Sequence, residues 1–318
     1  MLVAGGAGFV GSHLVEALVA RGARVTVVDD FSTGSEANLE AVAGEVEVEE
    51  LDLARDDLRP LLASRGVEAV FHVAGNAYVP TSVEDPRDDF TRNVVGTFNL
   101  LEAVRDAAPE ARTVHTSSAA VYGESAGGMS REEDATVPVA PYGVSKLAAE
   151  RYVAVYASVF GLWTANLRLF PVYGPRLRKQ VVYDLMRKIL DNPDELFIYG
   201  DGSQVRDFNH VGNVVDAILL VLGAGRGEGE AYNVAADEPV AIRDLAAMIC
   251  EHLGVSPTYV YSGDVRAGEV QSWVGDHSRL AELGYRPRIG LSEGLADTVA
   301  WFRQEELVGR TVERRAFG

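Results

Sequence analysis

The sequence predicts an α/β protein with a doubly wound parallel sheet, followed by a smaller α/β domain. Short apolar strands and periodic helices alternate through the first half of the 318 residues. This alternation is typical of right-handed βαβ crossovers, which place parallel strands in one sheet with helices on both faces. The second half is less regular, which predicts one domain over residues 1–170 and another, mainly, over residues 171–318. A segment at about residues 205–235 is expected to cross back to the first domain.

Each element of the first half follows from its local pattern. The strands are short apolar runs, and Val25–Asp29 is rich in β-branched residues, which favour extended backbone. The helices have apolar residues at helical spacing. Strands are predicted over residues 1–4, 25–29, 46–51, 69–73, 113–117 and 164–169, and helices over residues 10–21, 58–64, 90–107 and 142–160.

The second half joins helical segments through turns. Loops are predicted at Gly174–Arg178, Gly200–Ser203 and Gly223–Gly229, because glycine, proline and aspartate favour turns. Helices are predicted over residues 211–222, 242–253 and 291–302, with short strands between them.

The charge of the chain limits its partners. The formal net charge is −18, whereas nucleic acids and anionic membranes are bound through lysine and arginine. Neither is therefore an expected partner, and no apolar run approaches the roughly 20 residues of a membrane-spanning helix. The single cysteine, Cys250, excludes an intrachain disulfide and favours a cytoplasmic location. Any phosphate must be bound by local backbone N–H groups and a few arginines.

A glycine-rich turn follows the first strand and opens the first helix. Gly5, Gly8 and Gly11 allow a tight turn, close approach of a pyrophosphate and close packing of the helix on the strand. The helix N-terminus adds free N–H groups and a positive dipole end. Asp29 ends the second strand, where an acidic residue bonds a ribose 2′-hydroxyl and repels a 2′-phosphate. No arginine adjoins it in sequence, so NAD is expected rather than NADP.

Three polar side chains form a candidate catalytic set. Tyr142 and Lys146 lie four residues apart on a predicted helix and therefore share a face. Free tyrosine has a pKa of about 10, and a nearby ammonium and a positive nicotinamide ring would lower that pKa. The phenolate is then a general base for a hydroxyl group. Ser118 ends a strand at the carboxyl edge of the sheet, where α/β proteins bind ligands.

Several segments occur together in one order from Gly5 to about Phe302. They include GGAGFVG, SSAAVYG from Ser117, PYGVSK ending at Lys146, LRLFPVYGPR ending at Arg176 and GDGSQVRDF ending at Phe208. With them the chain resembles the extended short-chain dehydrogenases/reductases, in the branch of nucleotide-sugar epimerases and dehydratases. The resemblance implies a Rossmann-type NAD-binding domain, a second domain that binds a nucleotide-diphosphate sugar, and a homodimer paired through the helices over 90–107 and 142–160.

The resemblance also implies roles for individual residues. Ser118, Tyr142 and Lys146 would be catalytic, and the first two would contact the sugar. Substrate would also be bound by Arg206 and Arg266, which would hold the diphosphate, and by Glu269, where relatives carry aspartate. The cofactor would be bound by Gly5, Gly8, Phe9, Val10, Gly11, Asp29, Asp30, Ser32, Asp52, Leu53, Val73, Ala74, Gly75, Asn93, Ser117, Tyr142, Lys146 and Phe170.

Two further positions depart from the family pattern. Pro171 replaces an asparagine that usually touches the substrate phosphate or the cofactor, and proline cannot donate a hydrogen bond. Ala77 replaces a lysine often found after the strand over 69–73. Both differences concern how substrate is seated.

The expected reaction is epimerisation at C4 of the sugar. The alternatives are a dehydratase, decarboxylase or reductase on the same scaffold, and a non-catalytic NAD-binding sensor, against which Tyr142 and Lys146 argue. In the dehydratases that the chain resembles, an Asp–Glu pair follows the residue equivalent to Ser118. Ala119 and Ala120 stand there instead, and a methyl group cannot transfer a proton. The histidines show no metal-ligand spacing, so no catalytic metal is predicted.

Overall fold

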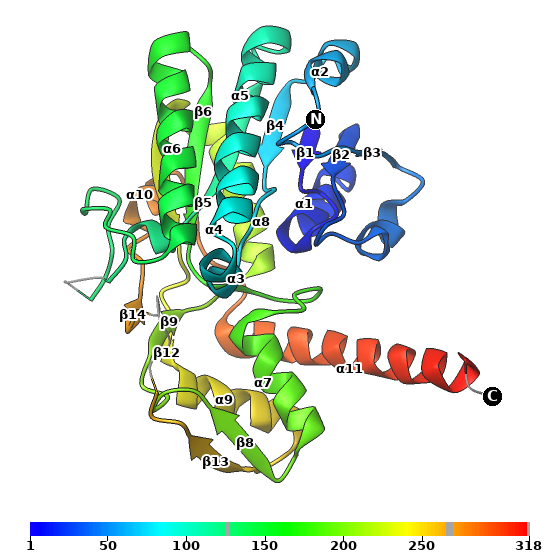
Figure 1. Cartoon of the computed structure of the whole chain (residues 1–318), viewed down its shortest axis with the longest axis vertical. Coiled ribbons are helices and arrows are strands. Elements are labelled where there is room, and N and C mark those ends of the chain that lie inside the picture. The colour runs from blue at the N-terminus through cyan, green and yellow to red at the C-terminus, as the bar shows by residue number, and fades with distance from the viewer. Residues whose placement is uncertain (125–127, 265–269, 317–318) are drawn as a thin grey trace.

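The computed structural model describes residues 1–124, 128–264 and 270–316, with side chains up to residue 307. Its centre is a seven-stranded sheet in the order β11-β6-β5-β4-β1-β2-β3, in which neighbouring strands are parallel (Figure 1). The strands are β1 (Leu2–Ala4), β2 (Val25–Asp29), β3 (Val46–Glu50), β4 (Ala69–His72), β5 (Arg112–Ser118), β6 (Thr164–Leu169) and β11 (Glu228–Val234). The predicted α/β class with a doubly wound parallel sheet is confirmed.

Helices cover both faces of this sheet, because successive residues of a strand point to opposite sides. Val3 and Phe71 lie in an apolar core with α1 and α8, whereas Leu2 and Val70 lie in a second core with α2, α5 and α6. The bounds of these helices are α1 (Phe9–Val19), α2 (Arg59–Arg65), α5 (Gly96–Ala107), α6 (Pro141–Phe160) and α8 (Val211–Ala224).

The helix predicted over 90–107 differs from the prediction in two respects. The helical segment already begins with α4 (Pro86–Phe90), where the carboxylate of Asp85 accepts hydrogen bonds from two backbone N–H groups of the first turn. It then contains a π-helical turn, η2 (Thr91–Val95), before α5. Such wide turns are frequent at functional sites, and Asn93 lies in this one.

The second half has its own apolar core, formed by α7 (Gln180–Asp191), α9 (Ile242–Leu253), α11 (Leu291–Ala316) and β8 (Glu195–Ile198). Sequence reasoning missed α7, because its N-cap position is Lys179 rather than a capping residue. It also ended α11 too early, and this helix extends away from the rest of the molecule (Figure 1).

The chain returns to the first sheet through β11, which pairs with β6. The glycine-rich loop predicted over 223–229 is shorter than expected, since α8 reaches Ala224 and β11 begins at Glu228. The division into two domains near residue 170 stays a prediction. No helix in the part of the chain that the structure describes is long and apolar enough to cross a membrane.

The remaining strands are short and pair outside the central sheet. β9, β12 and β14 form a three-stranded sheet, β7 pairs with β10, and β8 pairs with β13. Their bounds, with those of the remaining helices, are β7 (Val172–Tyr173), β9 (Val205–Asp207), β10 (Asn209–His210), β12 (Pro239–Ala241), β13 (Thr258–Tyr261), β14 (Ser272–Trp273), η1 (Glu36–Val42), α3 (Val79–Glu84), η3 (Ala119–Val121) and α10 (Ser278–Glu282).

A buried ion pair connects α6 to the sheet. The guanidinium of Arg168 on β6 donates from Nη2 and Nε to the carboxylate of Glu150 on α6, at 2.6 and 3.0 Å. Each side chain is only 4% exposed. Glu150 also accepts a hydrogen bond from the hydroxyl of Ser117 at 2.8 Å. The pair thereby fixes α6 against the carboxyl ends of β5 and β6.

We expect Glu150→Gln to destabilise the protein by about 3–5 kcal/mol, because it leaves a buried guanidinium without its counter-charge. The matched control is Glu47→Gln on β3, whose carboxylate pairs with Arg65 while 56% exposed. Exposed pairs contribute about 1 kcal/mol or less. Denaturant unfolding measures both changes, and equal losses of unfolding free energy would contradict this account.

Candidate active site

The predicted site residues gather along one edge of the sheet, because the carboxyl ends of parallel strands point the same way. Asp29 ends β2, Asp52 follows β3, Val73 follows β4, Ser118 ends β5 and Phe170 follows β6. The chain begins at β1 and runs outward to both sides, so the crevice beside β1 lies where the strand order reverses. Ligands of open α/β sheets bind at this position.

The turn from β1 into α1 has no space for side chains at Gly5, in the loop, and at Gly11, in the first turn of α1. A Cβ on Gly11 would lie 2.0 Å from the carbonyl oxygen of Gly5, and one on Gly5 would lie 2.6 Å from the Cα of Ala74. Gly8, the N-cap of α1, provides no side-chain cap. The close-packed loop and the N–H groups of the first turn therefore fit a pyrophosphate bound by backbone.

Asp29 ties this loop to the end of β2. One carboxylate oxygen accepts from the backbone N–H of Ala7 at 2.9 Å, and the other accepts from that of Phe31 at 3.0 Å. Burial raises the pKa of Asp29, while these backbone bonds lower it. The carboxylate is thus held at the place expected for recognition of a ribose.

Arg92 also lies at this edge, which no sequence feature indicated. Its Nη1 donates to the carboxylate of Asp30 at 3.0 Å and to the hydroxyl of Ser32 at 2.7 Å. Its Nε donates to Asp88 on the same helical segment. The arginine is therefore paired with two carboxylates, which offset its charge beside the ribose position.

The three predicted catalytic residues are brought together. Tyr142 and Lys146 lie on the face of α6 that meets β5, and Ser118 hydrogen-bonds with the Tyr142 phenol. Lys146 donates from Nζ to the carbonyl of Thr116 at 3.1 Å. The hydroxyl of Ser118 accepts from the backbone N–H of Ala120 at 3.2 Å. The side chains of Ser118, Tyr142 and Lys146 are all buried.

The pKa of Tyr142 differs from the expectation. Burial raises it to about 12, and the hydrogen bond with Ser118 only partly opposes this shift. Burial lowers the pKa of Lys146 to about 8. From the sequence we expected the Lys146 ammonium to lower the pKa of Tyr142. In the structure the lysine does not offset the effect of burial on the phenol. A positively charged nicotinamide ring would lower the pKa of Tyr142.

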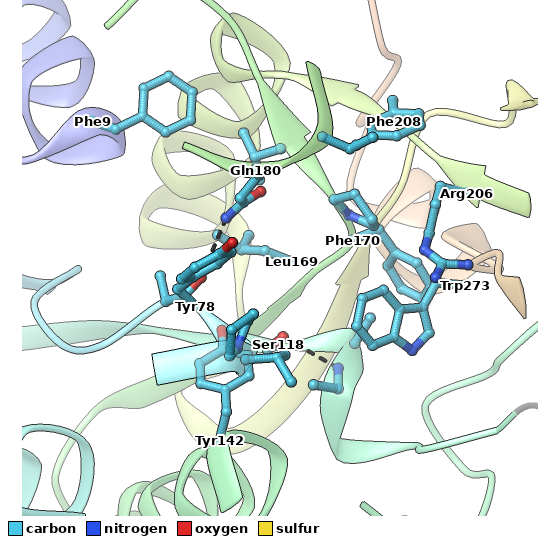
Figure 2. A pocket seen from close by; sticks show the side chains of 18 of the residues that line it. Phe9, Tyr78, Ser118, Tyr142, Leu169, Phe170, Gln180, Arg206, Phe208 and Trp273 are labelled. Carbon is cyan, nitrogen blue, oxygen red and sulfur yellow. Dashed lines mark hydrogen bonds between the residues drawn. The ribbon is translucent and has the colours of Figure 1, made fainter. Parts of the chain in front are cut away.

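These side chains line a cavity of about 580 Å³ between the two halves of the chain (Figure 2). Its size suits a small-molecule ligand. The predicted site residues in its lining are Phe9, Val10, Val73, Gly75, Ser117, Ser118, Tyr142, Lys146, Phe170 and Arg206. Outside the described lining lie Gly5, Gly8, Gly11, Asp29, Asp30, Ser32, Asp52, Leu53, Ala74 and Asn93. Arg266 and Glu269 lie outside the described residues.

Arg206 lines the cavity from the side of the second half. Its guanidinium donates to the carbonyls of Val205, Gln271 and Val270 and lies 4.9 Å from the centre of the Trp273 ring (Figure 2). Arg206 therefore fastens the chain around Val270 to β9 as well as facing the cavity. Its expected contact with a diphosphate stays a prediction.

Sequence reasoning missed several lining residues. Trp273, Gln204, Gln180 and Tyr78 all face the cavity, and Gln180 donates to the carbonyl of Ala77 at 3.2 Å. Gln204 lies within the recognised segment GDGSQVRDF but was not singled out, and the other three lie in none of the recognised segments. Pro171 and Ala77, the two departures from the family pattern, also line the cavity.

No metal centre is visible in the described part of the chain, where no group of three or more His, Cys, Asp or Glu side chains could hold an ion. His72 and His115 are buried in the sheet. Their rings instead bond neutral partners, Thr97 at 2.7 Å and Asn166 at 2.8 Å.

Comparison with known proteins agrees with this architecture. A sequence model of the NAD dependent epimerase/dehydratase family matches residues 1–235. The chain is 36% identical to a UDP-glucose 4-epimerase of Mycolicibacterium smegmatis, over 96% of this chain and 98% of the relative. It is 32% identical to a dTDP-glucose 4,6-dehydratase of an Actinoplanes species, over 95% and 97%. Thermus thermophilus UDP-glucose 4-epimerase, solved with NAD, superposes with a TM-score of 0.87 at 35% identity, over 95% and 98%.

We expect Gly11→Ala to abolish measurable NAD binding. Alanine usually stabilises a helix relative to glycine, by about 1 kcal/mol, but here its Cβ would meet the carbonyl oxygen of Gly5 at 2.0 Å. The matched control is Gly44→Ala, where a Cβ meets nothing within 4 Å. Titration of the cofactor-free proteins with NAD gives the comparison. An affinity of Gly11→Ala equal to that of the control would refute the tight-loop argument.

Proposed function

We propose 4-epimerisation of a nucleotide sugar as the reaction of this chain, which belongs to the NAD dependent epimerase/dehydratase family of extended short-chain dehydrogenases/reductases. Its cofactor is NAD, which when bound accepts a hydride from the sugar and gives one back. The proposed substrate is a nucleoside-diphosphate sugar, and the proposed reaction resembles that of UDP-glucose 4-epimerases.

The observation that carries this proposal is the pair Ala119 and Ala120. Both line the catalytic cavity directly after Ser118. Elimination of the C6 hydroxyl requires a base for the C5 proton and an acid for the leaving group, and neither methyl group can serve. Among the described lining residues the one carboxylate is Asp184, which comes from α7 in the second half. Epimerisation needs no such groups beyond the residue that handles the O4 proton.

Tyr142 is proposed as that residue. Its phenolate takes the proton of the C4 hydroxyl as the ketone forms and returns it after the hydride comes back. Ser118, hydrogen-bonded to the phenol, orients the sugar oxygen toward Tyr142. The ammonium of Lys146 would hold the nicotinamide ribose, and the positively charged nicotinamide ring would lower the pKa of the Tyr142 phenol. The ketone must rotate in between, and the cavity that opens above these residues supports this step.

The remaining ligand contacts are proposals as well. The glycine loop with Phe9 and Val10 would bind the pyrophosphate of NAD, and Asp29 its adenosine ribose. Asp30 and Ser32 would also lie beside this ribose. Asp52 and Leu53 would flank the adenine. The nicotinamide side would be lined by Val73–Gly75, Asn93, Ser117 and Phe170. Arg206, with Arg266 and Glu269, would bind the nucleotide part of the substrate.

We further propose a homodimer formed through α5 and α6. Apolar side chains stand exposed on these two helices, and contiguous exposed apolar surface commonly marks an interface. They are Phe98, Val144, Tyr152, Val155, Val159 and Phe160. A closed two-fold pairing would cover the same face on both copies. A cytoplasmic location belongs to the same proposal, supported by the single, buried Cys250.

The role of Tyr142 is tested by removing its hydroxyl. Tyr142→Phe should lower turnover by about 10²–10⁴-fold, the usual loss for general acid–base catalysis, while NAD affinity stays close to that of wild type. Tyr261→Phe, an exposed change on β13 outside the proposed dimer face, serves as control and should retain turnover. Wild-type turnover in Tyr142→Phe would remove this residue from the mechanism.

The reaction type is tested by the mass of the product. Incubation with a panel of UDP- and dTDP-linked hexoses, hexosamines and uronic acids should give, for the true substrate, a product of unchanged mass. Nuclear magnetic resonance should assign it as the C4 epimer. A product lighter by one water would indicate a dehydratase, and one lighter by carbon dioxide a decarboxylase. Binding of NAD with no turnover across the panel would favour the sensor.

A further inference from the structure

Asp89, on α4, is a buried carboxylate that the proposed reaction does not use. It is only 1% exposed. Two neutral side-chain amides bond it: Nδ2 of Asn76 at 2.8 Å and Nδ2 of Asn93 at 3.1 Å both donate to Oδ1. Among the described residues no lysine or arginine forms an ion pair with it. Burying a carboxylate this way is costly unless a charge elsewhere compensates.

The two amides connect Asp89 to two segments next to the cavity, the turn at Tyr78 and the helix α6. Asn76 follows β4, and its Oδ1 accepts from the backbone N–H of Tyr78 and the hydroxyl of Thr81, both at 3.1 Å. It thereby shapes the segment that carries Tyr78 into the cavity. Asn76 is thus fixed between the carboxylate of Asp89 and a cavity-lining turn.

Asn93 leads from Asp89 to the catalytic helix. Its Nδ2 also donates to the hydroxyl of Ser145 at 3.0 Å, and that hydroxyl donates to the carbonyl of Tyr142 at 3.0 Å. On its other side, a Cβ on Gly75 would lie 2.4 Å from Asn93 Oδ1 and 3.5 Å from Lys146 Nζ. The hydrogen bonds that start at Asp89 therefore extend to the backbone of Tyr142, and Asn93 also lies near the ammonium of Lys146.

The charges around Lys146 give Asp89 an electrostatic role. Burial lowers the pKa of Lys146, and Asp89 is the group that raises it. Asp89 also raises the pKa of Tyr142 in addition to burial. From β4 and β5 the ammonium faces His72 and His115, whose pKa values are lowered by burial and also by Lys146. On α6 itself, Glu150 is already paired with Arg168.

We propose that Asp89 is a positioning residue for the catalytic pair: its carboxylate fixes Asn76 and Asn93 beneath the cavity and keeps Lys146 in its ammonium form. This inference rests on the proposed roles of Tyr142 and Lys146. Asp89 itself does not touch the substrate. It acts through the amides and through its charge, which compensates a cation that is 5% exposed.

The test replaces the carboxylate by its neutral isostere, Asp89→Asn, in the NAD-loaded protein. Asparagine keeps the shape and an oxygen acceptor, so a purely structural role would leave the pH dependence of kcat unchanged. Because Asp89 raises the pKa of both Tyr142 and Lys146, its removal should move both limbs of the pH profile to lower pH. We expect a shift of about one pH unit, the low end for neighbouring charges.

The matched control is Glu84→Gln, which removes one negative charge from the same stretch at an exposed position. It should keep the wild-type profile. If Asp89→Asn does not fold, Asp89→Ser gives the same comparison, since its hydroxyl can still accept from one amide. The decisive result is the pH profile of whichever variant folds. If both limbs of that profile stay at the wild-type pH, the proposal is overturned, whether or not kcat falls.

A second measurement separates this proposal from the proposed reaction. Carbon-13 labelling of the tyrosine rings follows ionisation of Tyr142 directly, with its signal assigned from Tyr142→Phe. The ionisation should occur at lower pH in Asp89→Asn than in wild type. This result would stand even if the product assay ruled out epimerisation. An unchanged ionisation of Tyr142 would refute the coupling to Asp89 independently of any turnover.

Discussion

The packing of α6 against the carboxyl end of β5 is the contact on which the site depends. Three consecutive β5 residues meet three α6 residues spaced four apart: Thr116 meets Lys146, Ser117 meets Glu150, and Ser118 meets Tyr142. Spacing of four keeps these helix residues on one face, and strand residues follow one another at the sheet edge. A rotation of α6 would break all three contacts together. The buried pair of Glu150 with Arg168 opposes such a rotation.

The charges of the site are arranged in a chain whose net charge is −18. This charge gives no long-range attraction for an anionic ligand, and the proposed site for the cofactor pyrophosphate consists of backbone N–H groups at the start of α1. The arginine nearest the ribose position, Arg92, is balanced by carboxylates. The ammonium of Lys146 is compensated at a distance by Asp89. Two cations near the proposed cofactor site, Arg92 and Lys146, are thus balanced by acidic groups.

Local motifs carried most of the sequence-based prediction. The glycine loop, Asp29 and the Tyr142–Lys146 pair are recognisable because each depends on neighbours within a few residues. Asp89, Arg92 and Trp273 were missed, because their importance arises from contacts between distant segments; Arg92 and Asp30 are 62 residues apart. The rise in the pKa of Tyr142 was not foreseen from the sequence for a related reason: burial, its largest cause, is set by tertiary packing. The helix α7 was not predicted, although it has apolar periodicity, because no capping residue marks its start.

The turn η3 also bears on how such enzymes diverge. Its backbone is fixed by the bond from Ala120 N–H to Ser118 and by that from Tyr122 N–H to the carbonyl of Ala119. The methyl groups of Ala119 and Ala120 take no part in these bonds, and both residues border the cavity. Ala119 is buried in an apolar cluster with Phe170, and both alanines border the cavity, so a carboxylate at either position would lie at the cavity wall. Mutation can therefore introduce acid–base chemistry while the machinery for hydride transfer stays intact, so one scaffold can evolve toward a different product in very few steps.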